Sequence, residues 1–226
     1  MKLIVGLLAA STLVFSCKSD KKTDLNATID PTNPTKPIVL EAEPELSTTG
    51  AAAYSVTEGV VYWQGRKKIG GLHNGTIRIA GGELLVKEGR LVDGTITLDM
   101  ASISVSDLKD PGEKADLESH LKEADFFDTA KFPTAEFDVQ EVLPSQMPDF
   151  NRVISGDLKM KGKAAQVNIP VKLTIDGNTL TAQSATFIIN RTQWGVNYRS
   201  TVLGTAKDKL IDDNVVLSLT LAAKAK

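Results

Sequence analysis

VNIPVKLTIDGN, residues 167–178, is the most regular segment of this chain. Every second residue from Val167 to Ile175 is apolar, and the residues between them are Asn, Pro, Lys and Thr. Successive side chains of a β-strand point to opposite faces of a sheet, so this alternation predicts a strand with one apolar face. The Asp-Gly-Asn that follows is typical of a tight hairpin turn. The segment therefore predicts a strand that turns back into an antiparallel neighbour.

The same period of two recurs throughout the chain after Gly50. Apolar residues alternate with polar ones in these runs: Ile77 and Ile79; Ile96, Leu98 and Met100; Ala135, Phe137 and Val139; Leu158 and Met160; Phe187 and Ile189; Val215, Leu217, Leu219 and Leu221. Turns or tight bends are predicted at glycines that separate or interrupt the runs: Gly75, Gly81, Gly82, Gly89, Gly94, Gly156 and Gly162. The pattern gives about eight strands without alternating helices, which predicts a single all-β domain.

One stretch departs from the strand pattern. In residues 113–124, Leu117 and Leu121 lie one helical turn apart among charged residues. This spacing predicts a short surface helix inserted into the β domain.

The composition fits a globular body with one core. The chain is 42% hydrophobic and 24% charged, and its formal net charge is -2. Binding of nucleic acid requires clustered basic residues that neutralise phosphates. Here 26 Lys and Arg are interspersed with 28 Asp and Glu. We therefore expect no nucleic-acid partner.

Alternation alone leaves the architecture open. It does not distinguish a sandwich from a closed barrel, or a barrel with an apolar interior from a membrane-spanning barrel with an apolar exterior. Spanning barrels carry girdles of aromatic residues, and only 5% of this chain is aromatic. The apolar faces are therefore expected to point inward. The interior of a barrel of about eight strands is either filled by side chains or holds one small ligand, and periodicity leaves both open.

The N-terminus has the pattern of an export signal. Residues 1–16 combine a basic start, an apolar run from Leu3 to Phe15 and a small last residue. The run is shorter than the ~20 apolar residues of a membrane-spanning helix. The segment from Leu13 to Cys17 resembles the lipobox of bacterial lipoproteins, in which the cysteine is acylated and becomes the mature N-terminus. We therefore expect lipidation at Cys17, the only cysteine, and no internal disulfide.

Residues 17–49 are expected to form a disordered tether that begins at the lipidated Cys17. They show no periodic apolar pattern and carry four prolines among Thr, Asp, Glu and Lys. The predicted organisation is a signal peptide at 1–16, this tether at 17–49 and one β domain at 50–226.

A long motif in the middle of the chain resembles a known signature. HLKEADFFD, residues 120–128, followed by KFPTAEF, residues 131–137, resembles the signature of the YceI-like family. Further segments stand in the order that the family shows: WQG at 63–65, GLHNG at 71–75, LDM at 98–100 with Ser102 and Ile103, GDL at 156–158 with Lys161 and Gly162, and NRTQWGVNY at 190–198. The resemblance covers the chain from Ala51 to the C-terminus. Many members carry Arg-Asp just before the His-Leu pair, where this chain has Glu118 and Ser119, so no role of that basic group is carried over.

The resemblance implies a fold, a ligand and a location. The fold is a single extended, antiparallel, lipocalin-like β-barrel with a long apolar cavity, which in some members holds a polyisoprenoid such as a quinone. Members are periplasmic or secreted, so a lipidated Cys17 implies a lipid-anchored protein of the cell envelope, at the outer membrane and facing the periplasm or the surface. The expected function is to bind a polyisoprenoid lipid for carriage, storage or sensing. The alternative is an envelope protein–protein interaction module with a solid barrel core, and a homodimer is left open.

The residues expected to bind the ligand are inward-facing members of the alternating runs, with Arg191 at the mouth. They are Ile77, Ile79, Ile96, Leu98, Phe137, Val139, Leu158, Met160, Ile169, Val171, Leu173, Phe187, Ile189 and Arg191. Trp194 and Tyr198 are expected to share the mouth with Arg191. The alternative for Arg191 is the outer surface, where it stacks on an aromatic ring or pairs with a carboxylate.

No catalytic or metal site is predicted. His73 and His120 are the only histidines, and no third ligand stands at a recognisable spacing from them. Asp125 and Asp128 flank two phenylalanines, which we expect to pack the helix onto the barrel end while the aspartates cap it or face solvent. The sequence has no G-x-S-x-G elbow and no phosphate-cradling glycine loop. We therefore expect a binding protein rather than an enzyme, with no cofactor other than a bound isoprenoid lipid.

Overall fold

The structure is a computed structural model that describes residues 28–30, 33–38, 46–201, 204 and 210–226. The predicted signal peptide and Cys17 lie outside the described residues. The chain divides into two compact units, Met1–Val39 and Leu40–Lys226. In the part that is described, no helix has the length and apolarity to cross a membrane.

The described part of the first unit is a short hairpin. β1 (Thr28–Asp30) and β2 (Asn33–Ile38) pair in antiparallel fashion. The sequence pattern does not predict this hairpin, because the segment lacks the period of two. Much of the predicted tether lies outside the described residues, and the tether stays a prediction.

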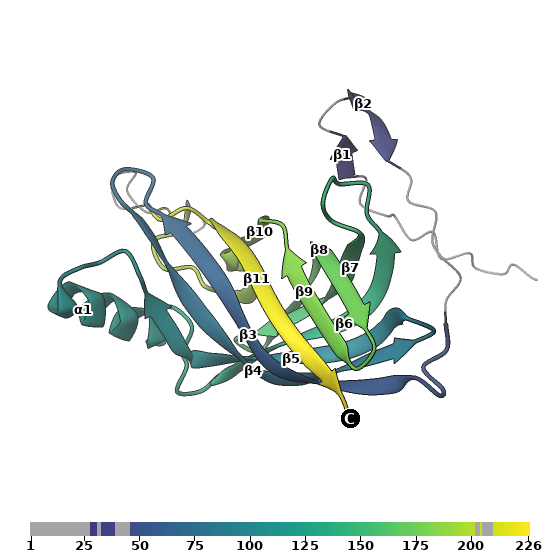
Figure 1. Cartoon of the computed structure of the whole chain (residues 1–226). Coiled ribbons are helices and arrows are strands. Elements are labelled where there is room, and N and C mark those ends of the chain that lie inside the picture. The colour runs from purple at the N-terminus through teal and green to yellow at the C-terminus, as the bar shows by residue number, and fades with distance from the viewer. Residues whose placement is uncertain (1–27, 31–32, 39–45, 202–203, 205–209) are drawn as a thin grey trace, which may run out of the picture. The chain divides into compact units, whose positions relative to one another are not determined.

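The described residues of the second unit form a closed antiparallel β-barrel with eight strand positions (Figure 1). Around the wall the order is β11, β3, β4, β5, β6, β7, β8 and β9, and β9 pairs with β11 to close the ring. β10 shares the position of β9, because both pair with successive parts of β11. The strands are β3 (Ala52–Arg66), β4 (Leu72–Lys87), β5 (Arg90–Val105), β6 (Thr134–Pro144), β7 (Arg152–Met160), β8 (Lys163–Asp176), β9 (Thr179–Ser184), β10 (Phe187–Asn190) and β11 (Asn214–Ala225). The predicted all-β barrel is confirmed.

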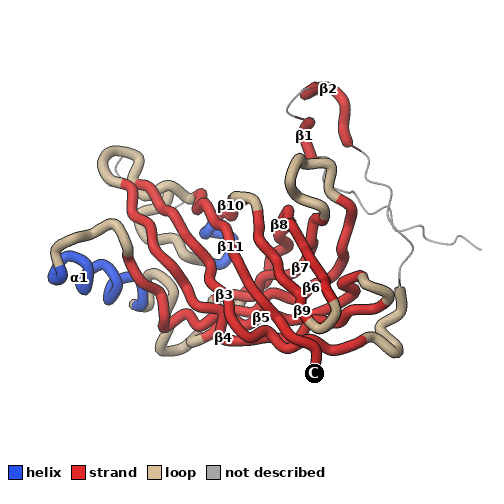
Figure 2. The backbone as a smooth tube through the Cα atoms, viewed as in Figure 1, coloured by secondary structure: helices blue, strands red, loops and turns tan. Residues whose placement is uncertain are grey.

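Helix is confined to two places in the described residues of the barrel unit (Figure 2). One is α1 (Pro111–Lys122), which follows β5, and the other is a short 3-10 helix, η1 (Arg191–Trp194). Asp110 caps α1, since its side chain accepts hydrogen bonds from first-turn N–H groups at 2.8 and 2.9 Å. Leu121 is buried toward the barrel interior. The predicted short helix is confirmed, and it begins earlier because Asp110 and Pro111 form the start signal.

Several glycines predicted to mark turns or bends lie inside long strands instead. Gly75 belongs to β4, where a Cβ atom would lie 1.7 Å from the carbonyl oxygen of Ser104 on β5. A Cβ at Gly82 would lie 2.3 Å from the carbonyl oxygen of Thr95. These glycines therefore allow neighbouring strands to approach closely. Gly89 does stand in a turn, with φ of 73°, as predicted.

The inward side chains far from α1 form a packed core. Leu84 and Val171 are 2% exposed and Leu180 is fully buried. Leu84 pairs with Gly94 near the start of β5, whereas α1 follows the other end of that strand. The interior is therefore solid at the end of the barrel opposite α1. All strands of the barrel and its core come from residues 52–225, so the unit from residue 40 to 226 contains what an independently folding domain requires.

Candidate functional site

The barrel interior is hollow at the α1 end. A cavity of about 310 Å³ lies there, within the range of ligand pockets of about 300–1,000 Å³. Its wall consists of inward apolar side chains of six strands, of α1 and of the loops beyond α1 and η1. The main wall residues are Val61, Trp63, Ile77, Leu98, Met100, Ile103, Leu117, Leu121, Phe126, Phe127, Leu158, Met160, Ile189, Val196, Tyr198, Ile211, Val215 and Leu217.

Polar side chains join this wall from the end of β3, the β3–β4 turn, the start of β4, α1, η1 and the residues between η1 and β11. They are Arg66, Lys67, His73, His120, Arg191, Arg199 and Asp212. The arrangement is an apolar chamber whose polar groups come from loops and strand ends. Such a chamber favours a ligand that is mostly apolar and has, at most, one polar end.

An aromatic cluster covers the chamber at the end of α1. The ring of His120 lies edge-on to the rings of Phe126 and Tyr198, with centroids 5.0 and 4.7 Å apart. His120 Nε2 is 3.1 Å from Asp125 Oδ2. Lys161 Nζ donates hydrogen bonds to the carbonyl oxygens of the loop that carries Phe126. Phe126 is buried, so the expectation that the phenylalanines pack the helix onto the barrel end agrees with its position.

His120, Glu123 and Asp125 form a group of potential metal ligands that the sequence analysis did not identify. One ligand atom from each of these three side chains lies within 4.8 Å of the others, although Glu123 and Asp125 are exposed. The loop after α1 folds back on the helix end and creates this group. The donors are of the types that hold divalent transition metals. The expectation that the protein has no metal site stays a prediction.

A second polar pair joins the start of β4 to the segment after β5. His73 Nδ1 is 2.9 Å from Asp107 Oδ2, and the Asn74 N–H donates to Asp107 Oδ1 at 2.8 Å. Burial by itself raises the pKa of the Asp107 carboxyl, but the hydrogen bonds from Asn74 and His73 outweigh burial and hold that pKa below its ordinary value. Since His73 contacts the cavity, this pair fixes one side of the opening.

The lowered pKa of Asp107 predicts a pH-dependent stability. Its folded pKa lies below the ordinary value of 3.8, so the charged carboxylate stabilises the fold above that pH, and the contribution is lost as the pH falls through the folded pKa. We expect Asp107→Asn to lower the free energy of unfolding by about 1 kcal/mol at neutral pH, and by less at a pH well below 3.8, where the carboxyl becomes protonated. Urea unfolding at both pH values measures this. An equal loss at both would show that the charge is not responsible.

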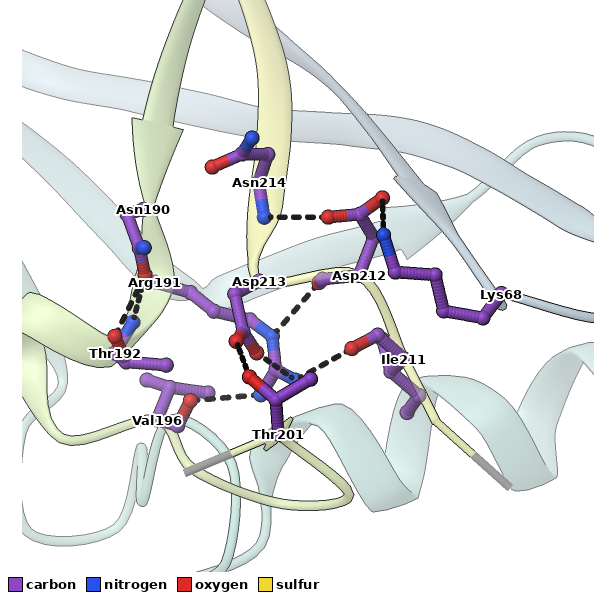
Figure 3. Close-up of polar contacts among 10 residues, drawn as sticks. All are labelled: Lys68, Asn190, Arg191, Thr192, Val196, Thr201, Ile211, Asp212, Asp213 and Asn214. Carbon is purple, nitrogen blue, oxygen red and sulfur yellow. Dashed lines mark hydrogen bonds and ion pairs between the residues drawn. The ribbon is translucent and has the colours of Figure 1, made fainter. Parts of the chain in front are cut away.

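Arg191 holds the loop after η1 to the start of β11 (Figure 3). The side chain is buried, and it donates to the carbonyl oxygens of Asp212, Val196 and Ile211 at 3.1, 2.7 and 3.2 Å. Its Nη2 also pairs with Asp213 Oδ1 at 3.1 Å. Burial lowers the pKa of Arg191, and the carboxylates of Asp213 and Asp212 oppose that shift. Arg191 thus lines the cavity, and although it pairs with a carboxylate, the pair is buried and not on the outer surface.

Six of the residues expected to bind the ligand line the cavity. They are Ile77, Leu98, Leu158, Met160, Ile189 and Arg191. The others are not among the lining residues: Ile79, Ile96, Phe137, Val139, Ile169, Val171 and Leu173 are buried in the barrel, and Phe187 is partly buried against its core. A role of any of them in ligand binding stays a prediction.

Sequence reasoning did not assign several wall residues to the site. Val61 and Trp63 belong to β3, whose weak alternation hides its inward face. Val196 lies after η1, where no periodic pattern indicates which side chains point inward. Tyr198, in the same segment, was expected at the mouth beside Arg191, and it lines the cavity. The available signals were the WQG motif at 63–65 and the NRTQWGVNY motif at 190–198.

One wall residue carries an unsatisfied donor. Trp63 Nε1 is buried and has no hydrogen-bond partner among the described residues. The indole of Trp194 differs, because its Nε1 donates to the carbonyl oxygen of Leu158 at 2.7 Å. A buried N–H without a partner costs about 1–3 kcal/mol, so Trp63 is a candidate donor to a ligand oxygen.

A single family model matches the segment that forms the barrel and its cavity. Residues 56–223 match the model described as the YceI-like domain. The chain belongs to the YceI-like family. The match runs from β3 into β11, so this YceI-like domain includes every wall residue of the cavity. The family resemblance seen in the motifs is confirmed.

One curated relative matches the central part of this YceI-like chain. UPF0312 protein SA2479 of Staphylococcus aureus (strain N315) is 30% identical over 117 residues, which are 49% of this chain and 63% of that protein. The chain thus spans less than two thirds of that relative.

Two solved structures share the fold. BcnA of Burkholderia cenocepacia has a TM-score of 0.55 and 22% identity, over 74% of this chain and 96% of BcnA. A polyisoprenoid binding domain from Saccharophagus degradans, implicated in plant cell wall breakdown, has a TM-score of 0.54 and 12% identity, over 77% of this chain and 99% of that domain. At these identities the likeness concerns the fold alone.

Proposed function

We propose that this YceI-like barrel binds an apolar lipid of the polyisoprenoid type in the cavity beside α1. The observation that carries the proposal is a chamber of about 310 Å³ with a mainly apolar wall, whose polar groups come from loops and strand ends. Fold similarity to a polyisoprenoid binding domain supports the choice of lipid class. Burial of each CH₂ contributes about 0.8 kcal/mol, so an isoprenoid chain binds there without directional contacts.

The chamber limits how much of the ligand it holds. Its volume is about twice that of a 150 Å³ cavity that holds one benzene. It therefore takes up a short isoprenoid or one end of a longer chain. A quinone-like head group has oxygens that accept hydrogen bonds, and His73, His120 or the Trp63 indole N–H would donate to them.

The proposal extends to location. A lipidated Cys17 would tether the barrel to a membrane of the cell envelope, most simply the outer membrane, facing the periplasm or the surface. The signal-like residues 1–16 and the lipobox-like Leu13 to Cys17 support this location. In that position the protein would carry, store or sense its lipid, as a monomer or a homodimer.

Extraction of the purified protein tests the proposal. The barrel unit, residues 40–226, is expected to carry isoprenoid lipid that organic solvent releases and mass spectrometry identifies. A Val61→Phe variant prepared in parallel narrows the cavity and is expected to carry less. Background lipids alone in both samples, together with no uptake of an added isoprenoid, would favour an interaction module.

A further inference from the structure

A basic hairpin tip at the cavity opening has no role in the lipid-binding proposal. The tip joins β3 to β4 and reads RKKIGG, residues 66–71. All six of its residues are exposed, and Ile69 keeps 58% of its surface accessible. A single exposed isoleucine is ordinary on a protein surface, but this one directly follows three consecutive cations.

Hydrogen bonds hold the tip in this exposed position. Lys67 N donates to the Gly71 carbonyl at 3.0 Å, and Lys68 N donates to the Leu210 carbonyl at 2.8 Å. Lys68 Nζ pairs with Asp212 at 3.1 Å. The backbone on both sides of Ile69 is thus anchored, and its side chain is presented to solvent by a fixed framework.

The tip stands at the opening of the lipid cavity. Arg66 and Lys67 contact the cavity from the β3 side, and Leu117 and His120 of α1 contact it from another side. The β3–β4 tip and α1 project from the same end of the barrel (Figure 1). Whatever surface binds the tip therefore faces the cavity opening.

The two sides of the cavity opening, the β3–β4 tip and α1, carry charges of opposite sign. The tip has three consecutive cations. Residues 110–125, which include α1, carry six acidic and two basic side chains. An anionic surface would therefore attract the tip and repel α1, so the barrel would approach that surface tip first.

Ile69 differs from the other exposed apolar side chains. Among the described residues, the large apolar side chains with high exposure are Tyr62, Ile69, Met147 and Ile188. Only Ile69 directly follows a run of three basic residues. An aliphatic side chain beside cations matches the chemistry of the phospholipid head-group boundary.

We propose that the tip at residues 66–71 docks the barrel on an anionic phospholipid bilayer. Ile69 enters the head-group boundary while Arg66 and Lys67 face lipid phosphates. This inference rests on the proposed function, because an isoprenoid lipid resides in a bilayer and an opening held against the bilayer lets it enter without crossing water. Ile69 itself does not line the cavity, whereas Arg66 and Lys67 contact both the cavity and the proposed docking surface.

Co-sedimentation with vesicles tests the docking. The barrel unit is mixed with vesicles of phosphatidylcholine alone, or with added phosphatidylglycerol, in the absence of isoprenoid. We expect binding only to the anionic vesicles, weakened by salt. Each cation near an anionic surface contributes about a fivefold gain, so Lys67→Glu is expected to lower partitioning by about 25-fold. Ile69→Asp is expected to lower it by at least about tenfold.

Ile188→Asp is the matched control, because Ile188 is 63% exposed and lies on β10, two strands from β3 and outside the basic run. It is expected to partition like the unmodified protein. Equal losses in Ile69→Asp and Ile188→Asp, or equal binding to both vesicle types, would overturn the docking proposal. Uptake of isoprenoid from detergent solution is expected to be normal in Ile69→Asp. Failure of that uptake in the unmodified protein would instead contradict the lipid-binding function.

Discussion

Replacement of Arg191 by methionine is expected to lower the free energy of unfolding of the barrel by about 3–5 kcal/mol. The buried guanidinium donates to three backbone carbonyls and pairs with Asp213. Methionine fills similar space but donates nothing, so these oxygens and the Asp213 carboxylate lose their partner. Urea unfolding followed by far-ultraviolet circular dichroism measures the loss.

Arg78→Met is the matched control for the Arg191 change. Arg78 also pairs with an aspartate, Asp99, but its side chain is 66% exposed. An exposed pair contributes at most about 1 kcal/mol, so this variant is expected to remain close to the unmodified protein. A loss below about 1 kcal/mol for Arg191→Met, or equal losses in both variants, would contradict the role of Arg191 in holding the loop.

Val61→Phe is expected to abolish most lipid binding while the barrel remains stable. Val61 lines the cavity, so the larger ring enters empty space and leaves the free energy of unfolding unchanged or raises it by about 0.5–2 kcal/mol. The ring displaces the equivalent of about four CH₂ groups of ligand, which weakens binding by roughly 100-fold.

A valine-to-phenylalanine change at the solid end of the barrel is expected to destabilise the fold instead. Val139 is 6% exposed and does not line the cavity. Val139→Phe is therefore expected to overpack the core and to lower the free energy of unfolding by about 1–3 kcal/mol. If Val61→Phe were destabilised as strongly as Val139→Phe, the chamber would not be hollow in solution.

The strands and their inward faces follow from local pattern, whereas the position of the cavity does not. Period-two alternation correctly places both Ile77 and Ile79 inside, because each strand has one apolar face. Only Ile77 lines the cavity. The difference depends on where α1 and the loop after η1 close the barrel, and that is a tertiary arrangement that alternation along one strand does not encode.

The residues around the cavity opening were the least predictable part of the site. Tyr198 reaches the cavity from an irregular segment whose path depends on hydrogen bonds of Arg191 to Val196 and Ile211. Glu123 and Asp125 approach His120 through a loop that reverses after α1. No periodic signal describes such segments, so only the family motif indicated that they matter. Lipidation of Cys17 and the tether stay predictions of the sequence.

A calorimetric titration of the barrel unit with a farnesyl-length isoprenoid tests most directly whether the cavity binds lipid. We expect saturable binding of one ligand per chain with a negative heat-capacity change, because apolar surface leaves water. Affinity should fall by roughly 100-fold in Val61→Phe and remain unchanged in folded Val139→Phe. No saturable binding, or equal affinity in Val61→Phe, would contradict the assignment of this chamber as a lipid site.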